Sequence, residues 1–95
     1  MDKPREYLKK MRTEMGLTMQ DMGDALGMSR QYYNLIETGV SQKRMDITLV
    51  RRIADIFGVT LEDIARFEQA WLAEAEAEEA EQETSETAAQ AAGTA

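Results

Sequence analysis

Hydrophobic side chains along this chain recur at intervals of three and four residues, the spacing that places them on one face of an α-helix. Five such segments follow one another, and almost no stretch alternates with the period of a β-strand. The predicted helices span about residues 4–15, 18–26, 29–37, 46–57 and 60–72. The pattern therefore predicts an all-α domain, built as a five-helix bundle.

Most of these helices begin at a side chain that can accept a hydrogen bond from a free backbone amide. The candidate caps are Asp2, Thr18, Ser29, Asp46 or Thr48, and Thr60, the last with Asp63 in a capping box. Gly27 is placed to end the second helix in a left-handed conformation. Because Ser29 follows so closely, residues 18–39 have the pattern of a helix-turn-helix.

The second helix of this pair has two different faces. Tyr33 and Ile36 lie three residues apart on its inner side, which leaves Arg30, Gln31 and Asn34 on the opposite one. Arg, Gln and Asn are the side chains that best read the edges of DNA bases. The same three residues are equally compatible with an ordinary solvated helix face, so the pattern alone leaves both interpretations open.

Composition narrows the classes of function. The 95 residues include no Cys and no His, which excludes disulfides, thiol nucleophiles, the usual zinc sites and imidazole chemistry. No pair of carboxylates stands out as an acid/base constellation, so we expect no enzyme, no metal and no cofactor. We also expect a cytoplasmic protein without a membrane segment, because the sequence has neither an apolar run of about 20 residues nor a signal-peptide pattern.

The net charge of −7 conceals two regions. Residues 1–73 contain all 11 Lys and Arg together with 11 of the 18 Asp and Glu, and are therefore neutral. Residues 74–95 contain the remaining acids, no base and no large apolar side chain. We therefore predict a folded domain over residues 1–73 and a disordered acidic tail over residues 74–95. The overall charge does not exclude DNA as a partner.

The segments LKKMRTEMGLTMQDMGDALGMSRQYYNLIETG and ITLVRRIADIFGVTLEDI resemble the phage repressor and Cro helix-turn-helix family, also called XRE-like. The resemblance runs from about Leu8 to Ile64. It implies a five-helix bundle whose third helix enters the major groove of double-stranded DNA, in most members as a homodimer on two half-sites. It also implies a sequence-specific transcriptional regulator, which we expect to be a repressor.

Matched to the family position by position, Arg12 and Glu37 correspond to an ion pair that ties the first helix to the end of the third. Arg30 and Gln31 correspond to the base-reading positions of the recognition helix, and Asn34 to a position one turn further along. Arg is suited to guanine O6 and N7, and Gln to adenine N6 and N7. These roles are implied by the resemblance alone.

Contacts to the DNA backbone are expected from Gln20, Tyr32, Lys43 and Arg44, the last two within the loop that follows the third helix. The chain departs from the family at two places. Met19 stands where a phosphate-contacting Gln is usual, with Gln20 next to it. Gly23 replaces the usual Ala where the second and third helices cross, which keeps the space but lowers helix stability by about 1 kcal/mol.

Two features of the C-terminal region leave alternatives open. Phe67, Trp71 and Leu72 extend an apolar stripe that either folds back onto the first helix or, as we favour, forms a dimer contact. The acidic tail either solubilises the protein, competes with DNA for the basic loop, or recruits a basic protein. The last option is part of a rival interpretation, in which the chain is an antitoxin-like or anti-repressor protein-binding module on the same fold.

Overall fold

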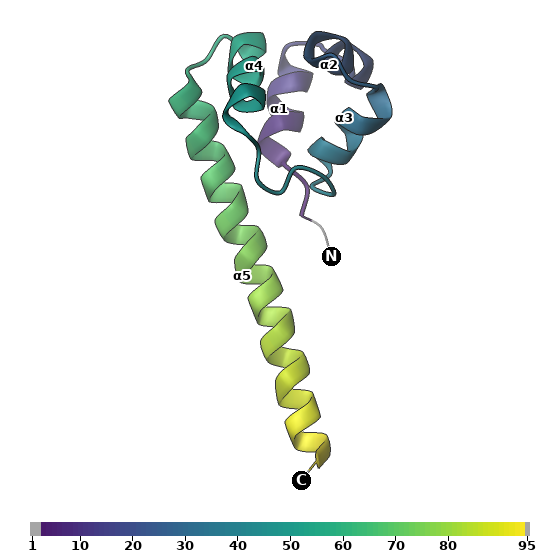
Figure 1. The fold of residues 1–95 in the computed structure, drawn as a ribbon, viewed down its shortest axis with the longest axis vertical. Coiled ribbons are helices and arrows are strands. Elements are labelled where there is room, and N and C mark those ends of the chain that lie inside the picture. Colours follow the sequence, from purple (N-terminus) through teal and green to yellow (C-terminus); the bar gives the residue numbers. More distant parts are fainter. Residues whose placement is uncertain (1–2, 95) are drawn as a thin grey trace.

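The computed structural model describes the backbone of residues 3–94 and the side chains of residues 3–80. Within this part the chain forms five helices and no strand, as shown in Figure 1. They are α1 (Glu6–Glu14), α2 (Met19–Leu26), α3 (Arg30–Glu37), α4 (Ile47–Phe57) and α5 (Leu61–Thr94). The predicted all-α class is confirmed. No helix among residues 3–94 has the length and apolar character needed to cross a membrane.

Local hydrogen bonds to capping side chains explain where α2, α4 and α5 begin. The Thr18 hydroxyl accepts from the Asp21 amide at 3.0 Å, and the Asp21 carboxylate accepts from the Thr18 amide at 2.9 Å. Thr60 and Asp63 form the same capping box at the start of α5, at 3.0 and 3.2 Å. Asp46 caps α4 by accepting from the Leu49 amide. Of the two predicted caps for α4, Asp46 is therefore the one used.

Helix α1 is shorter than predicted at its N-terminal end. Pro4 precedes the helix, and Arg5 occupies the N-cap position without a side-chain cap hydrogen bond. Instead, the Arg5 amide donates to the Glu37 carbonyl oxygen at the end of α3, at 2.8 Å. The Arg5 amide thus makes a tertiary contact rather than a hydrogen bond of a helical turn. The predicted cap Asp2 lies outside the described residues.

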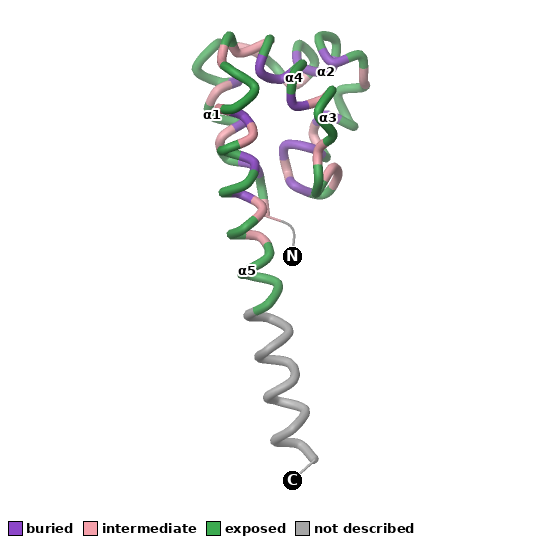
Figure 2. Tube along the Cα trace, turned by 60° about the vertical axis from the view of Figure 1, so that its left-hand side comes forward, coloured by how far each residue is buried: buried purple, intermediate pink, exposed green. Residues whose placement is uncertain are grey.

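The core draws on all five helices, whose inner faces are the purple stretches of Figure 2. Its buried apolar side chains are Leu8, Met22, Leu26, Tyr33, Ile36, Val50, Ile53, Ala54 and Ile64. All of them lie on faces that the hydrophobic spacing assigned to the interior. Burial of these side chains is the main force that holds α2 and α3 against α1 and α4.

Helix α5 differs most from the prediction. It does not end near residue 72, because residues 74–80 continue it past the other four helices (Figure 1). The sequence places this acidic extension, as we call residues 74–80, in the tail because it has no large apolar side chain to bury. In the structure, exposed ion pairs to distant residues accompany the continuation. The side chains of residues 81–94 and the whole of Ala95 lie outside the described part, so the predicted disorder of residues 81–95 stays a prediction.

Candidate nucleic-acid interface

The turn between α2 and α3 is built from a left-handed glycine followed by a cap. Gly27 adopts φ +70°, and the Ser29 hydroxyl accepts from the Tyr32 amide at 3.1 Å. A Cβ atom at Gly23 would lie 2.8 Å from the Met28 carbonyl oxygen, closer than Cβ atoms normally approach. An alanine at position 23 would therefore require the backbone of the turn to shift. Glycine allows α2 to pack directly against this turn.

The two faces of α3 are separated as the spacing predicts. Tyr33 and Ile36 are fully buried, whereas Arg30 and Gln31 are exposed at the first turn. Asn34, one turn later, is half-buried. The three base-reading candidates thus occupy the outer side of one short helix, with Arg30 and Gln31 the more accessible.

Arg12 and Glu37 form a two-pronged ion pair between α1 and the end of α3. The Arg12 Nε and Nη2 atoms each donate to a Glu37 carboxylate oxygen at 2.9 Å. The third nitrogen donates to the Leu17 carbonyl oxygen at 3.0 Å. Both side chains are buried, and the pairing raises the pKa of Arg12 above its usual value. The pair therefore links α1 to the C-terminal end of α3.

The loop after α3 is organised by a residue that sequence reasoning did not single out, Arg5. Its guanidinium is completely buried. It donates to the carbonyl oxygens of Ile36 at 2.6 Å and Ser41 at 3.1 Å, and also to that of Gln42. Its Nε atom donates to the Glu68 carboxylate of α5 at 2.6 Å. Arg5 therefore joins the N-terminal segment, the loop and α5.

Two aromatic side chains, Trp71 and Tyr7, also take part. We call Arg5, Glu68, Trp71 and Tyr7 the Arg5 cluster. The guanidinium lies 4.0 Å from the centroid of the Trp71 ring, within the range of a cation–π interaction. The Trp71 indole N–H donates to the Lys3 carbonyl oxygen at 2.9 Å. Tyr7 donates its hydroxyl to Glu68 at 2.7 Å, and burial raises the pKa of this phenol. Gly39 is required here, because a Cβ atom would lie 2.0 Å from the Lys3 carbonyl oxygen.

These contacts bear differently on the three residues of the apolar stripe on α5. Trp71 is only 6% exposed and packs within its own chain, so it follows the fold-back alternative. Phe67 lies on Tyr7 with 5.6 Å between the ring centroids but keeps 41% of its surface exposed. Leu72 is half-buried. Of the three dimer candidates, Phe67 is the most accessible to a second chain.

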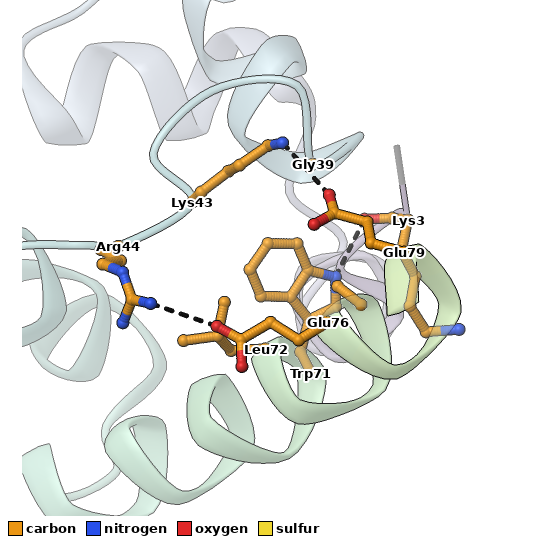
Figure 3. Close-up of a pocket in the computed structure, with 9 residues that line it drawn as sticks. Lys3, Gly39, Lys43, Arg44, Trp71, Leu72, Glu76 and Glu79 are labelled. Atoms are coloured by element: carbon orange, nitrogen blue, oxygen red, sulfur yellow. Dashed lines mark hydrogen bonds and ion pairs between the residues drawn. The ribbon is translucent and has the colours of Figure 1, made fainter. Parts of the chain in front are cut away.

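The basic loop, residues 40–45, presents two exposed cations, each paired with the acidic extension. Lys43 Nζ lies 3.4 Å from a Glu79 carboxylate oxygen, and Arg44 Nη2 lies 3.1 Å from one of Glu76. Figure 3 shows both pairs on either side of Trp71. A cleft of about 170 Å³ lies between the loop and α5 at this point. The two phosphate-contact candidates of the loop thus already have anionic partners.

The other two backbone-contact candidates are held by hydrogen bonds. Gln20 donates to the Asp24 carboxylate at 2.9 Å along the exposed face of α2. The Tyr32 hydroxyl accepts from the Gln42 side chain at 2.8 Å, which joins α3 to the basic loop. Gln42 has φ +59°, a left-handed conformation unusual for a residue other than glycine. No local signal in the sequence marks Gln42 or Arg5 for these roles.

Comparison with known proteins agrees with this architecture. A family model described as helix-turn-helix matches residues 8–64, which is more than half of the chain. An uncharacterized HTH-type transcriptional regulator, derived from the SPbeta prophage of Bacillus subtilis (strain 168), is 38% identical over 55 residues. That match covers 58% of this chain, which spans about half (49%) of the relative's length. No solved structure gives a significant match. The chain belongs to the XRE-like helix-turn-helix family.

Proposed function

We propose that this protein is a sequence-specific DNA-binding transcriptional regulator that inserts α3 into the major groove of an operator and represses by occupying it. One observation carries the proposal: Arg30 and Gln31 project from the first turn of α3, while the inner face of that helix is buried in the bundle. Family membership supports the proposal, as does the similarity to the prophage-derived relative, which is named as an HTH-type transcriptional regulator.

The proposed division of roles follows the chemistry of the side chains. Arg30 reads guanine and Gln31 reads adenine, and each well-made pair is worth about 1–3 kcal/mol of discrimination. Asn34 has less freedom because it is half-buried, so it contributes to the sequence preference more weakly.

Positioning on the duplex is assigned to groups that contact phosphate. Lys43 and Arg44 supply charge from the basic loop, and Gln20 and Tyr32 supply hydrogen bonds. The free amides at the N-terminal ends of α2 and α3 add further donors, because a helix N-terminus favours an anion.

We further propose that the protein binds as a homodimer on two half-sites, as helix-turn-helix proteins commonly do. Phe67 is the first candidate for the contact between chains, since it is a large apolar side chain on the exposed side of α5.

The test is selection from a random duplex DNA pool at near-physiological salt, followed by affinity measurements on the enriched sequence. A palindromic motif is expected from a dimer. Arg30→Ala should relax base preference at one position of each half-site, whereas Lys43→Ala should weaken binding to matched and scrambled duplexes alike and reduce the salt slope. Arg66→Ala removes a positive charge from the exposed side of α5 and serves as the control.

Two results would contradict the proposal. Absence of any enriched motif, with binding that vanishes as salt rises, would reduce DNA to a non-specific contact. Identical behaviour of the Arg30 and Lys43 variants on matched and scrambled duplexes would show that the roles are assigned wrongly.

A further inference from the structure

We propose that the acidic extension of α5 is an intramolecular competitor for the DNA backbone, which occupies the cations of the basic loop until phosphates displace it. This proposal rests on the proposed function, because it assumes that Lys43 and Arg44 contact phosphate. It assigns a regulatory role to Glu76 and Glu79, whose carboxylates are the groups that phosphate would replace.

The spacing of the acids along α5 matches the cations that they face. Glu76 and Glu79 are three residues apart, on neighbouring positions of one helix face, and they pair with Arg44 and Lys43. Glu74 and Glu78 are four residues apart and both lie near Lys3, at 3.6 and 3.0 Å from its Nζ. One pair of carboxylates thus faces the basic loop and the other faces Lys3, and these cations are distant from each other in the sequence.

The helix presents these acids from a fixed base. Trp71 and Glu68 anchor the preceding turns through the Arg5 cluster, where the contacts are buried. The carboxylates are therefore held beside the loop by a helix rather than by a flexible tether. A group held in this way acts at a high effective concentration, so it competes with an incoming anion without any second molecule.

The same contacts contribute little to holding the fold together. All four residues of the Lys43–Glu79 and Arg44–Glu76 pairs are more than half exposed, and exposed ion pairs contribute little to stability. Moreover, Glu74 and Glu78 repel each other at the i, i+4 spacing. An acidic surface that adds little stability yet neutralises the cations of the interface fits a role in competition.

Carboxylate and phosphate offer the loop the same chemistry, namely anionic oxygen acceptors for Lys and Arg. When DNA approaches, its phosphates meet both the paired cations and the negative charge of the helix behind them. This electrostatic penalty lowers the free energy gained from contacts with the DNA backbone, and those contacts do not depend on the base sequence. Binding to arbitrary DNA is therefore weakened, and base contacts made by α3 must supply a larger share of the affinity for an operator.

The experiment compares the full chain with Glu76→Gln/Glu79→Gln by affinity measurements on the selected operator and on a scrambled duplex. Each exposed pair is worth a factor of about 1.4 to 5, so removing both pairs should make the double variant bind both duplexes about 2- to 25-fold more tightly near 0.1 M salt. The gain should shrink towards unity near 1 M salt, where charges are screened within about 3 Å.

Two controls separate a specific contact from general charge. Asp55→Asn/Glu62→Gln also removes two exposed acids, but from the end of α4 and the first turn of α5; it should change affinity by less than about twofold. A double-mutant cycle between Lys43→Gln and Glu79→Gln should show coupling, because Glu79 has no cation to occupy once Lys43 is neutral. Circular dichroism of each variant should match that of the unchanged chain.

The outcomes distinguish this proposal from the proposed function. If the unchanged chain binds its operator and Glu76→Gln/Glu79→Gln binds no more tightly than the control variant, competition is overturned while the function stands. Competition would likewise be overturned if Glu79→Gln raised the affinity for DNA by the same factor in the Lys43→Gln background as in the unchanged chain. The acid would then act by general repulsion of DNA. If neither the unchanged chain nor any variant binds DNA, both proposals fail.

Discussion

Two sets of charged pairs connect α5 to the rest of the molecule, and they differ in almost every physical respect. Arg5 and Glu68 pair at 2.6 Å, with the arginine completely buried. Lys43 and Glu79 pair at 3.4 Å with more than half of each side chain exposed. Both pairs involve the loop after α3, since Arg5 binds its carbonyl oxygens from inside while Glu79 contacts its outer surface.

The difference shows how one helix can make both a permanent structural contact and a replaceable surface contact. A buried pair that loses one partner leaves an uncompensated charge, so it acts as a fixed joint. An exposed pair exchanges readily with water, salt or another anion, so it acts as a contact that can be replaced. The Arg5 cluster thus holds the basic loop in position from inside, and the acidic extension pairs with the exposed cations of that loop.

The largest effect on stability is expected from removal of the buried arginine, Arg5. Arg5→Ala should lower the free energy of unfolding by about 3–5 kcal/mol, because Glu68 loses its partner and buried carbonyl oxygens of the loop lose their donor. That is a large part of the 5–15 kcal/mol typical of a whole domain. Urea denaturation followed by circular dichroism measures the effect.

Arg66→Ala is the matched control for that experiment, because Arg66 pairs with Asp63 on the exposed side of α5. It should change the free energy of unfolding by less than about 1 kcal/mol. Equal losses in the Arg5 and Arg66 variants would show that burial is not what separates the two kinds of pair.

The carboxylates of the capping boxes sharpen the comparison, since they are exposed but bonded to backbone amides. The hydrogen bond from the Thr18 amide lowers the pKa of Asp21 below 3.8, and that from the Thr60 amide does the same for Asp63. Because the folded-state pKa is the lower one, this contribution to stability is fully present above pH 3.8 and is lost as pH falls through the folded-state value.

Asp21→Asn/Asp63→Asn should therefore be less stable than the unchanged chain at pH 7 and should lose less stability between pH 5 and pH 2, in the acid range where carboxylates titrate. Thermal unfolding of both proteins across that pH range measures how steeply the stability of each falls with pH. If the two proteins showed parallel pH dependence, the capping carboxylates would have no part in acid unfolding.

The smallest effect on stability is expected from the acidic extension itself. Glu76→Gln/Glu79→Gln should shift the free energy of unfolding by less than about 1 kcal/mol in either direction, because lost ion pairs are offset by relief of repulsion among the remaining acids. Urea denaturation of this variant beside Arg5→Ala gives the direct comparison. A loss of several kcal/mol would mean that the extension is a structural joint like the Arg5 cluster.

The sequence by itself determined the features that depend on neighbours three or four residues apart. The cap at Thr18, the capping box at Thr60, the left-handed turn at Gly27 and the two faces of α3 all agree with the spacing of the residues. These features are predictable because each rests on a local hydrogen bond or on the period of a single helix. The positions of Arg30 and Gln31 on the outer face belong to this group, while their roles in base reading stay predictions.

Only the tertiary structure decided the contacts between distant residues. Arg5 meets Glu68 across 63 positions of the sequence, and Trp71 meets the Lys3 carbonyl oxygen across 68. No periodic pattern encodes such pairs, because a lone arginine before a helix looks the same whether it reaches water or a buried carboxylate. The course of α5 beyond Leu72 belongs to this group as well. The described acids of this stretch, within residues 74–80, pair with cations of elements that the fold brings beside them.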